Sequence, residues 1–443
     1  MNYLIMASQM LLGLSILIVL HELGHFLAAR AFGIKVEKFY LFFDAWGFKL
    51  FSFKRGDTEY GMGWLPLGGY VKIAGMIDES MDKEAMKKPA EPWEFRSKPA
   101  WQRLIVMLGG VTVNFVLGIF IFWMLFYVNG ENHLPLKSMK YGIVAEKLGK
   151  ELGFQTGDMI TGVEGQKIKY YDELFKSDII YGNNIEININ RNGKDSSIKL
   201  PSDFINRLTE STKGGFIHPR VKFKVNGLTD GEYAKKAGIE KGDMIVKVGS
   251  DTIIYEDQLI SALASYKDKT IDIQVLRNGK PIAMPCKVNS EGRIGVELLE
   301  NYEEFAQDHI KYSLGESFSA SVTKGVSTIT DNLKGFGKIF SGEVSASNSV
   351  QGPIGIMKFY GDTWDWTKFW SLTAMISMVL AFMNLLPIPA LDGGHVVFLL
   401  IEMIIRRPLS EKILERAQVI GMIILLTLMV LIFGNDIWKT FIK

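Results

Sequence analysis

Four long apolar runs are the feature that most constrains how this 443-residue chain can fold. They occupy residues 1–32, 101–128, 369–405 and 417–436. A helix of about 20 apolar residues is long enough to cross the hydrocarbon core of a bilayer. The sequence therefore predicts a membrane protein with a four-span α-helical core. Only Met-Asn-Tyr precedes the first run, which lacks the basic start of a signal peptide, so we predict a retained span.

Basic residues next to the runs predict the orientation of the spans. Arg30, Lys35 and Lys98 flank the segment 33–100, and further arginines and lysines occupy 406–418. Because cytoplasmic loops carry an excess of Lys and Arg, we place these two segments in the cytoplasm. Both termini and the region 129–368 then lie on the opposite side, although Lys439 and Lys443 count against this. The net charge of +2 gives no argument for nucleic acid as a partner.

The third run contains helix breakers. Pro387 and Pro389 precede the sequence Asp392-Gly393-Gly394-His395 within 369–405. Proline in a helix interior removes a backbone hydrogen bond and clashes with the preceding turn. The run is therefore either one long broken helix or a span followed by a re-entrant segment.

The region between the second and third runs contains an internal repeat. The segment 153–160 (GFQTGDMI) recurs as 238–245 (GIEKGDMI), and the turn 191–194 (RNGK) recurs as 277–280. Asn-Gly between alternating apolar residues is typical of a β-hairpin. We predict two similar, mostly β domains over 129–205 and 215–290. The doubled motif resembles tandem PDZ domains, which bind a peptide end by strand addition; packed spacer domains without a ligand are the alternative.

A connector over 300–368 follows the repeat, and it shows helical periodicity. Apolar residues recur at spacings of three and four, at Phe318, Val322, Val326, Ile329, Leu333, Phe336 and Phe340. This pattern predicts an amphipathic helix. The helix either packs on the second small domain or lies on the outer membrane surface beside the third span.

The sequence His21-Glu22-Leu23-Gly24-His25 lies in the first run. On a helix, residues four apart project from one face, so both imidazoles can bind one Zn²⁺. Glu22, one residue on, can take a proton from a water that the metal activates. The alternative is a pair of packed histidines. Ionisable groups inside a span are costly and usually mark function, which favours the metal site.

Catalytic zinc needs a third protein ligand and an open position. His21 is 18 residues beyond Tyr3, and Asp392 is 22 residues beyond Trp370. With the orientation above, both lie near the cytoplasmic third of the membrane. His395 lies at nearly the same depth, so the type of ligand does not choose between it and Asp392.

The motif HELGH at 21–25 and the sequence 384–394 (NLLPIPALDGG) together resemble the site-2 protease family, in its regulator-of-sigma-E branch. The resemblance covers essentially the whole chain. It implies that Asp392 is the third zinc ligand and that Asn384 holds substrate. Asn114 falls in a region similar to the family's Gly-Pro-x-x-Asn-Phe, with Gly110 where Pro is usual. For Asn114, a helix–helix hydrogen bond and a catalytic role both remain open.

The segment 48–75 alternates like a hairpin and is interrupted at Gly68-Gly69. In the family, this segment is a membrane-reentrant β-loop beside the active site, which implies that Gly68 and Gly69 contact substrate. A sheet edge holds a peptide extended by strand addition. An ordinary cytoplasmic hairpin is the alternative.

These features predict an intramembrane zinc endopeptidase in the bacterial inner membrane. By resemblance, its partners are single-span membrane proteins, including an anti-sigma factor and remnant signal peptides, and the tandem domains filter them by size. Peptide ends at the PDZ-like domains and membrane lipid are further expected partners. A metal transporter and a non-catalytic PDZ scaffold are the rival functions.

Overall fold

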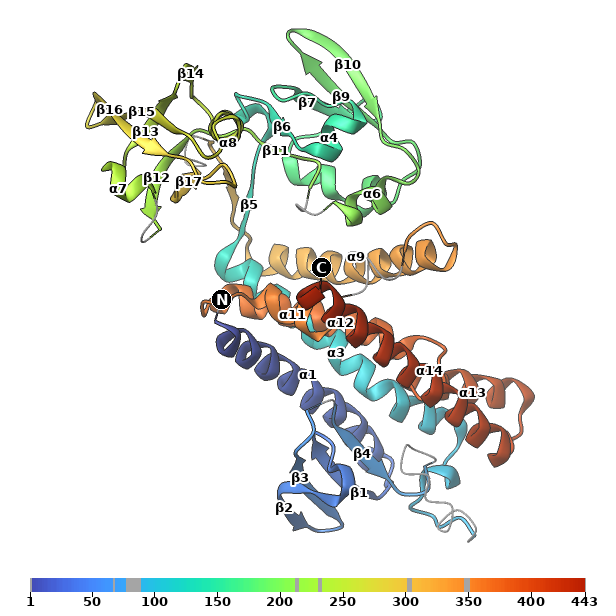
Figure 1. The fold of residues 1–443 in the computed structure, drawn as a ribbon. Helices are drawn as coiled ribbons and strands as arrows, with labels where there is room; N and C mark the ends of the chain where they lie inside the picture. Colours follow the sequence, from blue (N-terminus) through green and yellow to red (C-terminus); the bar gives the residue numbers. More distant parts are fainter. Residues whose placement is uncertain are drawn as a thin grey trace. The chain divides into compact units, whose positions relative to one another are not determined.

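The structure is a computed structural model that describes residues 2–66, 68–76, 89–211, 215–229, 233–300, 305–345 and 351–442. Its contacts divide the chain into two compact units (Figure 1). The helical unit comprises Met1–Glu131 and Lys311–Lys443, and the inserted unit comprises Asn132–Ile310. The predicted amphipathic connector therefore begins in the inserted unit and continues in the helical one.

Four helices of the helical unit are long and apolar enough to cross a membrane, among the residues described. They are α1 (Tyr3–Ala31), α3 (Ala100–Asn129), α12 (Trp366–Leu385) and α14 (Glu411–Ile437). Even the shortest has 20 residues, which at about 1.5 Å per residue spans the hydrocarbon core. The four predicted apolar spans are thus present as helices. A π-helical turn, η6 (Trp438–Ile442), ends the described chain.

The third apolar run forms two helices rather than one. α12 ends at Leu385, and α13 begins at Asp392 and ends at Ile405. Pro387 and Pro389 lie in the break, where Ala390 adopts a positive φ of 79°. Because proline lacks the N–H that helix continuation requires, the break follows from the sequence. The 14-residue α13 is too short to be counted as a span by itself.

A four-stranded sheet follows α1. Its strands are β1 (Val36–Leu41), β2 (Lys49–Arg55), β3 (Thr58–Gly63) and β4 (Tyr70–Ile73), in the order β2-β3-β1-β4. The predicted hairpin is confirmed, because β2 and β3 pair antiparallel around the turn. The prediction missed β1, which pairs parallel with β3 and antiparallel with β4. The 48–75 segment is therefore part of a larger sheet whose edges are β2 and β4. A short 3-10 turn, η1 (Ala45–Gly47), connects β1 to β2, and another, η2 (Phe95–Ser97), precedes α3.

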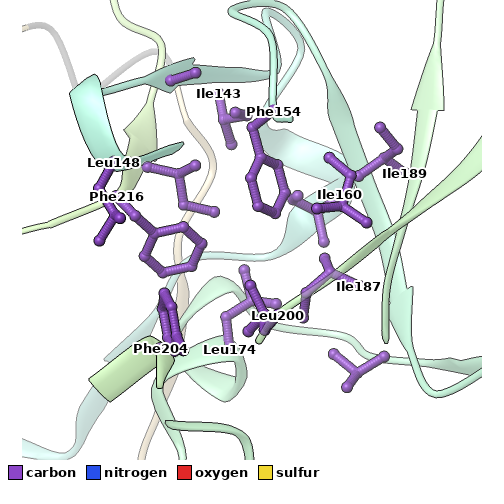
Figure 2. Packing of buried hydrophobic residues seen from close by; sticks show 14 of the residues in the cluster. Ile143, Leu148, Phe154, Ile160, Leu174, Ile187, Ile189, Leu200, Phe204 and Phe216 are labelled. Atoms are coloured by element: carbon purple, nitrogen blue, oxygen red, sulfur yellow. The ribbon is translucent and has the colours of Figure 1, made fainter. Parts of the chain in front are cut away.

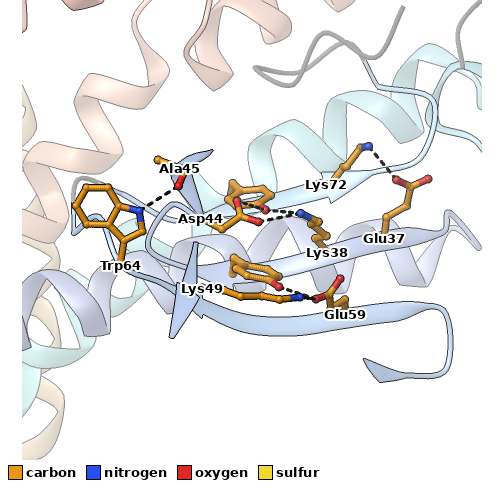
Figure 3. Close-up of polar contacts among 10 residues, drawn as sticks. Glu37, Lys38, Asp44, Ala45, Lys49, Glu59, Trp64 and Lys72 are labelled. Atoms are coloured by element: carbon orange, nitrogen blue, oxygen red, sulfur yellow. Dashed lines mark hydrogen bonds and ion pairs between the residues drawn. The ribbon is translucent and has the colours of Figure 1, made fainter. Parts of the chain in front are cut away.

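The two faces of this sheet differ in chemistry. Large apolar side chains on and beside β2 are exposed, namely Trp46, Phe48, Leu50, Phe51 and Phe53. Charged and tyrosine side chains instead pair with one another in ladders across the sheet (Figure 3). Such exposed apolar surface is unusual for a protein in water and fits contact with lipid.

The connector forms α9 (Leu314–Phe340), followed by α11 (Pro353–Tyr360). The buried face of α9 consists of small residues, Ser317, Ser321 and Gly325. Gly325 lies against Ile119 of α3 and Met378 of α12. The predicted helix is therefore present and lies beside α3 and α12. Besides the small residues, Phe318 and Phe336 of the predicted apolar stripe contact these helices, through the rings of Trp123 and Phe382.

The inserted unit contains the same strand pattern twice. Its first half comprises β5 (Glu131–His133), η3 (Leu136–Ser138), β6 (Ile143–Ala145), α4 (Lys147–Leu152), β7 (Met159–Val163), β8 (Gln166–Lys167), η4 (Tyr171–Phe175), α5 (Ser177–Ile180), β9 (Glu186–Arg191), β10 (Lys194–Lys199), α6 (Phe204–Glu210) and β11 (Ile217–Pro219). Its second half comprises β12 (Phe223–Leu228), α7 (Tyr233–Ala237), β13 (Met244–Val248), β14 (Asp251–Thr252), α8 (Glu256–Ser265), β15 (Thr270–Arg277), β16 (Lys280–Lys287), β17 (Val296–Glu300) and β18 (Asp308–Ile310). The orders β10-β9-β7-β8 and β16-β15-β13-β14 correspond strand for strand.

The repeated sequence motifs have a common structural cause. Both Asn-Gly turns have positive φ at each residue, as a two-residue hairpin requires. The Arg before each turn binds the buried Asp of the Gly-Asp motif: Arg191 Nε lies 2.7 Å from Asp158, and Arg277 Nε lies 2.8 Å from Asp243. Each ion pair thus ties a hairpin to the preceding strand of the same sheet.

Each half also has its own apolar core. Figure 2 shows the first, where Phe154, Phe204 and Phe216 pack edge to face around Leu174. A second cluster, including Val225, Ile245 and Val275, fills the other half. Two separate cores explain why the repeat forms two small domains.

Candidate metal centre and active-site cavity

The first two candidate ligands lie on the continuous helix α1. His21 and His25 are four residues apart, and their Nε2 atoms are 3.2 Å apart. The His25 ring is buried, and its Nδ1 lies 2.8 Å from the backbone oxygen of Val106. A carbonyl only accepts, so Nδ1 carries the proton and Nε2 presents a lone pair. This is the ring state that binds a metal.

Asn114 of α3 supports the other imidazole. It is fully buried, and its Nδ2 lies 3.1 Å from His21 Nδ1. The Oδ1 atom of Asn114 is buried without a partner among the described residues. A half-turn of the amide exchanges these atoms, so that Oδ1 accepts a hydrogen bond from His21 Nδ1–H. In that orientation the lone pair of His21 Nε2 is available to a metal.

The third candidate ligand comes from the first residue of α13. Asp392 Oδ2 lies 3.2 Å from His21 Nε2 and 3.3 Å from His25 Nε2. Asp392 Oδ2 is nevertheless buried and has no hydrogen-bond partner among the residues described. The short distances to the two imidazoles are therefore not hydrogen bonds. Three lone-pair atoms that face one another at this distance need a shared cation.

The spacing of the three atoms fits zinc. Ligands of tetrahedral zinc at about 2.0–2.1 Å from the metal are about 3.3–3.4 Å apart, close to the three observed separations. The structure groups His21, His25 and Asp392 as possible metal ligands within the part of the chain that it describes. His395, one turn further along α13, lines the same cavity but is not part of this group.

Glycines let α1 and α3 approach closely at the site. A Cβ on Gly24 would lie 2.3 Å from the backbone oxygen of Gly109. A Cβ on Gly110 would lie 2.5 Å from His25 Nε2 and 2.7 Å from His21 Nε2. Gly110 therefore leaves room beside both ligand atoms.

The side chain of Glu22, a residue of α1, faces the sheet. Gly69 packs against Ile18 and Glu22, and Val71 of β4 lines the same cavity as Glu22. Glu22 lines the same cavity as the three candidate ligands. It is thus placed beside the metal position, without being part of the ligand group.

Of the other residues predicted to bind substrate, two lie at the metal position or on the cavity wall and one does not. Asn384, near the end of α12, has its Nδ2 3.4 Å from His21 Nε2, next to the metal position. Gly69 lines the cavity. Gly68 lies instead against the ring of Phe43 and is not among the lining residues.

The cavity around these groups has a volume of about 460 Å³. The sheet forms much of its wall, through Lys38, Asp44 and the segment 69–73. Lys38 and Tyr70 both donate to Asp44, at 2.9 and 2.8 Å, so the charges on this wall are paired (Figure 3). α14 contributes Gln418, which was not predicted as a site residue because it lies two residues after the charged stretch 411–416.

The chain is similar to known proteins over nearly its whole length. The family model described as peptidase family M50 matches residues 9–428. The regulator of sigma E protease of Haemophilus influenzae is 27% identical, over 98% of this chain and 99% of the relative. The regulator of sigma-E protease RseP of Escherichia coli is 28% identical, over 97% of each. A Vibrio cholerae protein named as a zinc metalloprotease is 28% identical, over 96% of this chain and 97% of the relative.

Proposed function

The chain belongs to peptidase family M50 and is a membrane zinc metalloprotease, and we propose that it cuts peptide bonds within or near the spans of single-span membrane proteins. The observation that carries this proposal is the meeting of His21 and His25 of α1 with Asp392 of α13 inside an apolar bundle. Ionisable groups are costly inside a membrane unless they have a function there. A peptide-binding scaffold would not need three lone-pair atoms at metal-ligand spacing, and a set of three protein ligands leaves the open position that catalytic zinc requires.

We assign a role to each residue around the proposed zinc ion. His21, His25 and Asp392 hold the metal, while Asn114 and the Val106 carbonyl fix the two imidazoles. Zinc, when bound, polarises the scissile carbonyl and makes a coordinated water acidic. Glu22 removes a proton from the attacking water and delivers it to the leaving amine.

Asn384 and strand β4 serve the substrate in this proposal. The amide of Asn384 lies beside the metal position, where it can donate to a substrate carbonyl. β4 is a sheet edge whose residues line the cavity. A transmembrane helix hides its peptide bonds, so the bond to be cut has to be held extended, and strand addition at β4 achieves this.

The inserted unit is proposed to filter substrates. We interpret its two halves, predicted over 129–205 and 215–290, as PDZ domains. In the structure the first half extends to β11, which pairs with β6, and the second begins at β12 and extends to β17. The two domains admit proteins already trimmed outside the membrane and also offer edges for peptide ends. In the orientation favoured by the basic residues, this unit and both termini lie on the periplasmic side of the inner membrane. The relatives named as regulators of sigma E protease support an anti-sigma factor as a substrate, with remnant signal peptides as a second class.

Metal removal tests this proposal. Purified protein in detergent is treated with a zinc chelator and assayed on a single-span substrate, with mass spectrometry of the products. We expect cleavage to stop with the chelator, to return with added Zn²⁺, and to map within or next to the apolar segment. Cleavage that persists in metal-free protein, or that maps far from the span, contradicts the proposal.

A further inference from the structure

α14 is attached to the rest of the helical unit at few points. Only 11% of its most apolar window is buried, compared with 39% in α3 and α12. Among its described side chains, the buried ones are Gln418, Gly421 and Asp436. Two of these three are polar, which is unusual in a helix that otherwise exposes apolar residues.

Two of the three contacts explain the position of the helix. A Cβ on Gly421 would lie 1.7 Å from the backbone oxygen of Pro389, so α14 touches the segment just before Asp392. Asp436 accepts hydrogen bonds from the backbone N–H groups of Ile354 and Gly355 at the start of α11, at 2.6 and 3.3 Å. The helix is thereby fixed at the catalytic segment and near its own C-terminal end.

Gln418 has no such structural explanation. It is 4% exposed and lines the active-site cavity. None of the hydrogen bonds described for the chain involves its amide, and its amide atoms are not among the fully buried atoms that lack a partner, so they keep access to the cavity. The side chain is otherwise enclosed by protein, so the free donor and acceptor of this amide are directed to the cavity, where a ligand can pair with them.

The chemistry of an extended substrate supplies that ligand. Backbone N–H and C=O groups of a strand point alternately to its two sides, and pairing with β4 satisfies one side. The other side has few water molecules available inside a membrane, and each unpaired group is costly there. A carboxamide is itself peptide-like, since it donates through Nε2 and accepts through Oε1. Gln418 is the one carboxamide among the cavity-lining residues of the described chain.

We propose that Gln418 is a substrate-binding residue that hydrogen-bonds the backbone edge of the extended substrate left unpaired by β4. β4 borders the cavity through residues 70–73, and Glu22 lines the same cavity. α14 borders it at the Asp392 segment, because Gly421, one turn from Gln418, packs on Pro389. The substrate backbone therefore receives partners from two separate elements. This inference rests on the proposed function, because it assumes that a peptide is the substrate.

The test combines a variant with substrates altered at single backbone positions. Gln418→Met keeps the length of the side chain and removes the amide, and Ile420→Met is the matched control on the exposed face of α14. The substrate is a synthetic single-span peptide in which one peptide N–H at a time, around the cut, is replaced by an ester oxygen. We expect Gln418→Met to lower kcat/KM about tenfold to a hundredfold, the effect of one or two lost hydrogen bonds in a dry site. Ile420→Met should match wild type, and zinc content should stay unchanged in both.

The ester series identifies the bond. At one position, wild type should cut the ester more slowly than the normal peptide. Gln418→Met should cut these two substrates at the same rate, because its hydrogen bond to that position is already missing. Additive losses at every position, or a Gln418→Met variant as fast as wild type, overturn the inference. If Gln418→Met fails to fold, Gln418→Asn is tested with the same esters. Rate losses that add at every position in this variant overturn the inference. Cleavage by wild type and by Glu22→Gln at equal rates would instead refute the proposed function itself.

Discussion

Asp392 and His395, the two candidates for the third zinc ligand, are only three residues apart at the start of α13. Both are at similar depth in the sequence, and both are ordinary zinc ligands, so the sequence alone left them open. In the structure α13 begins at Asp392, and the break before it turns this side chain toward His21 and His25. His395, one turn on, lines the cavity from a different position.

Zinc content distinguishes the two residues directly. We expect Asp392→Asn to lose most of its zinc, because a neutral amide is a weaker ligand than a carboxylate. His395→Ala should retain one zinc per chain. The measurement is elemental analysis of both variants purified in detergent. Full zinc in Asp392→Asn together with its loss in His395→Ala would reverse the assignment.

The Asp–Arg ion pairs of the inserted unit explain why the Gly-Asp motif and the Arg before the Asn-Gly turn occur in both copies of the repeat. A hydrogen bond from Arg277 holds the pKa of Asp243 below its usual range. Such a group stabilises the fold fully above the ordinary Asp pKa, and this contribution disappears as the pH falls through the lowered folded-state value.

We expect Asp243→Asn to destabilise the inserted unit by about 2–4 kcal/mol at neutral pH, because a partly solvated arginine loses a buried carboxylate. The difference from wild type should shrink below about pH 3.9. Hydrogen exchange of the unit in the full-length protein measures it. Asp251→Asn, at an exposed position on β14, is the control and should behave as wild type. A difference that is the same at pH 3 and pH 7 would contradict this assignment.

At the scale of elements, the sequence predicted what local periodicity encodes. The four apolar helices, the β2–β3 hairpin and the two Asn-Gly turns follow from patterns within about 20 residues. β1 was missed because its pairing with β3 is parallel and bridges an intervening hairpin strand. The apolar stripe of α9 was predicted, but its buried small residues were not, because small residues pack closely by shape, which hydrophobic periodicity does not detect.

The contact between α14 and the Asp392 segment yields an element-scale prediction. Gly421→Ala should push α14 away from Pro389 and lower cleavage at least about tenfold, since a displacement of about 1 Å at an active site costs that much or more. Gly434→Ala is the matched control, because a Cβ there would meet no atom within 4 Å. Initial cleavage rates of the two variants are compared at equal zinc content. Equal rates for both variants and wild type would show that this contact has no influence on the site.

At the scale of the whole molecule, the site joins the two ends of the chain, and the inserted unit lies between them in sequence. β5 and β18, where the chain enters and leaves that unit, pair with each other. A short linker between these strands can therefore replace the residues between 133 and 308 without separating the ends. The sequence located the repeat, but no local pattern states what the unit does for the site.

Removing the inserted unit tests its role as a size filter. We expect the full-length protein to cut a trimmed substrate about tenfold or more faster than one with a folded outer domain, which corresponds to about 1.4 kcal/mol in activation free energy. The shortened protein should cut both at similar rates. A preference that survives the deletion would place the selection within the helical unit.

The central claim is that Glu22, beside zinc held by His21, His25 and Asp392, activates the water that cuts a membrane-spanning peptide. The most direct test compares wild type and Glu22→Gln in cleavage of one single-span substrate in detergent, with zinc measured in the same samples. The account predicts one zinc per chain in both proteins and a loss of cleavage of about a hundredfold or more in Glu22→Gln, the usual contribution of a general base. Cleavage by Glu22→Gln at the wild-type rate would contradict it.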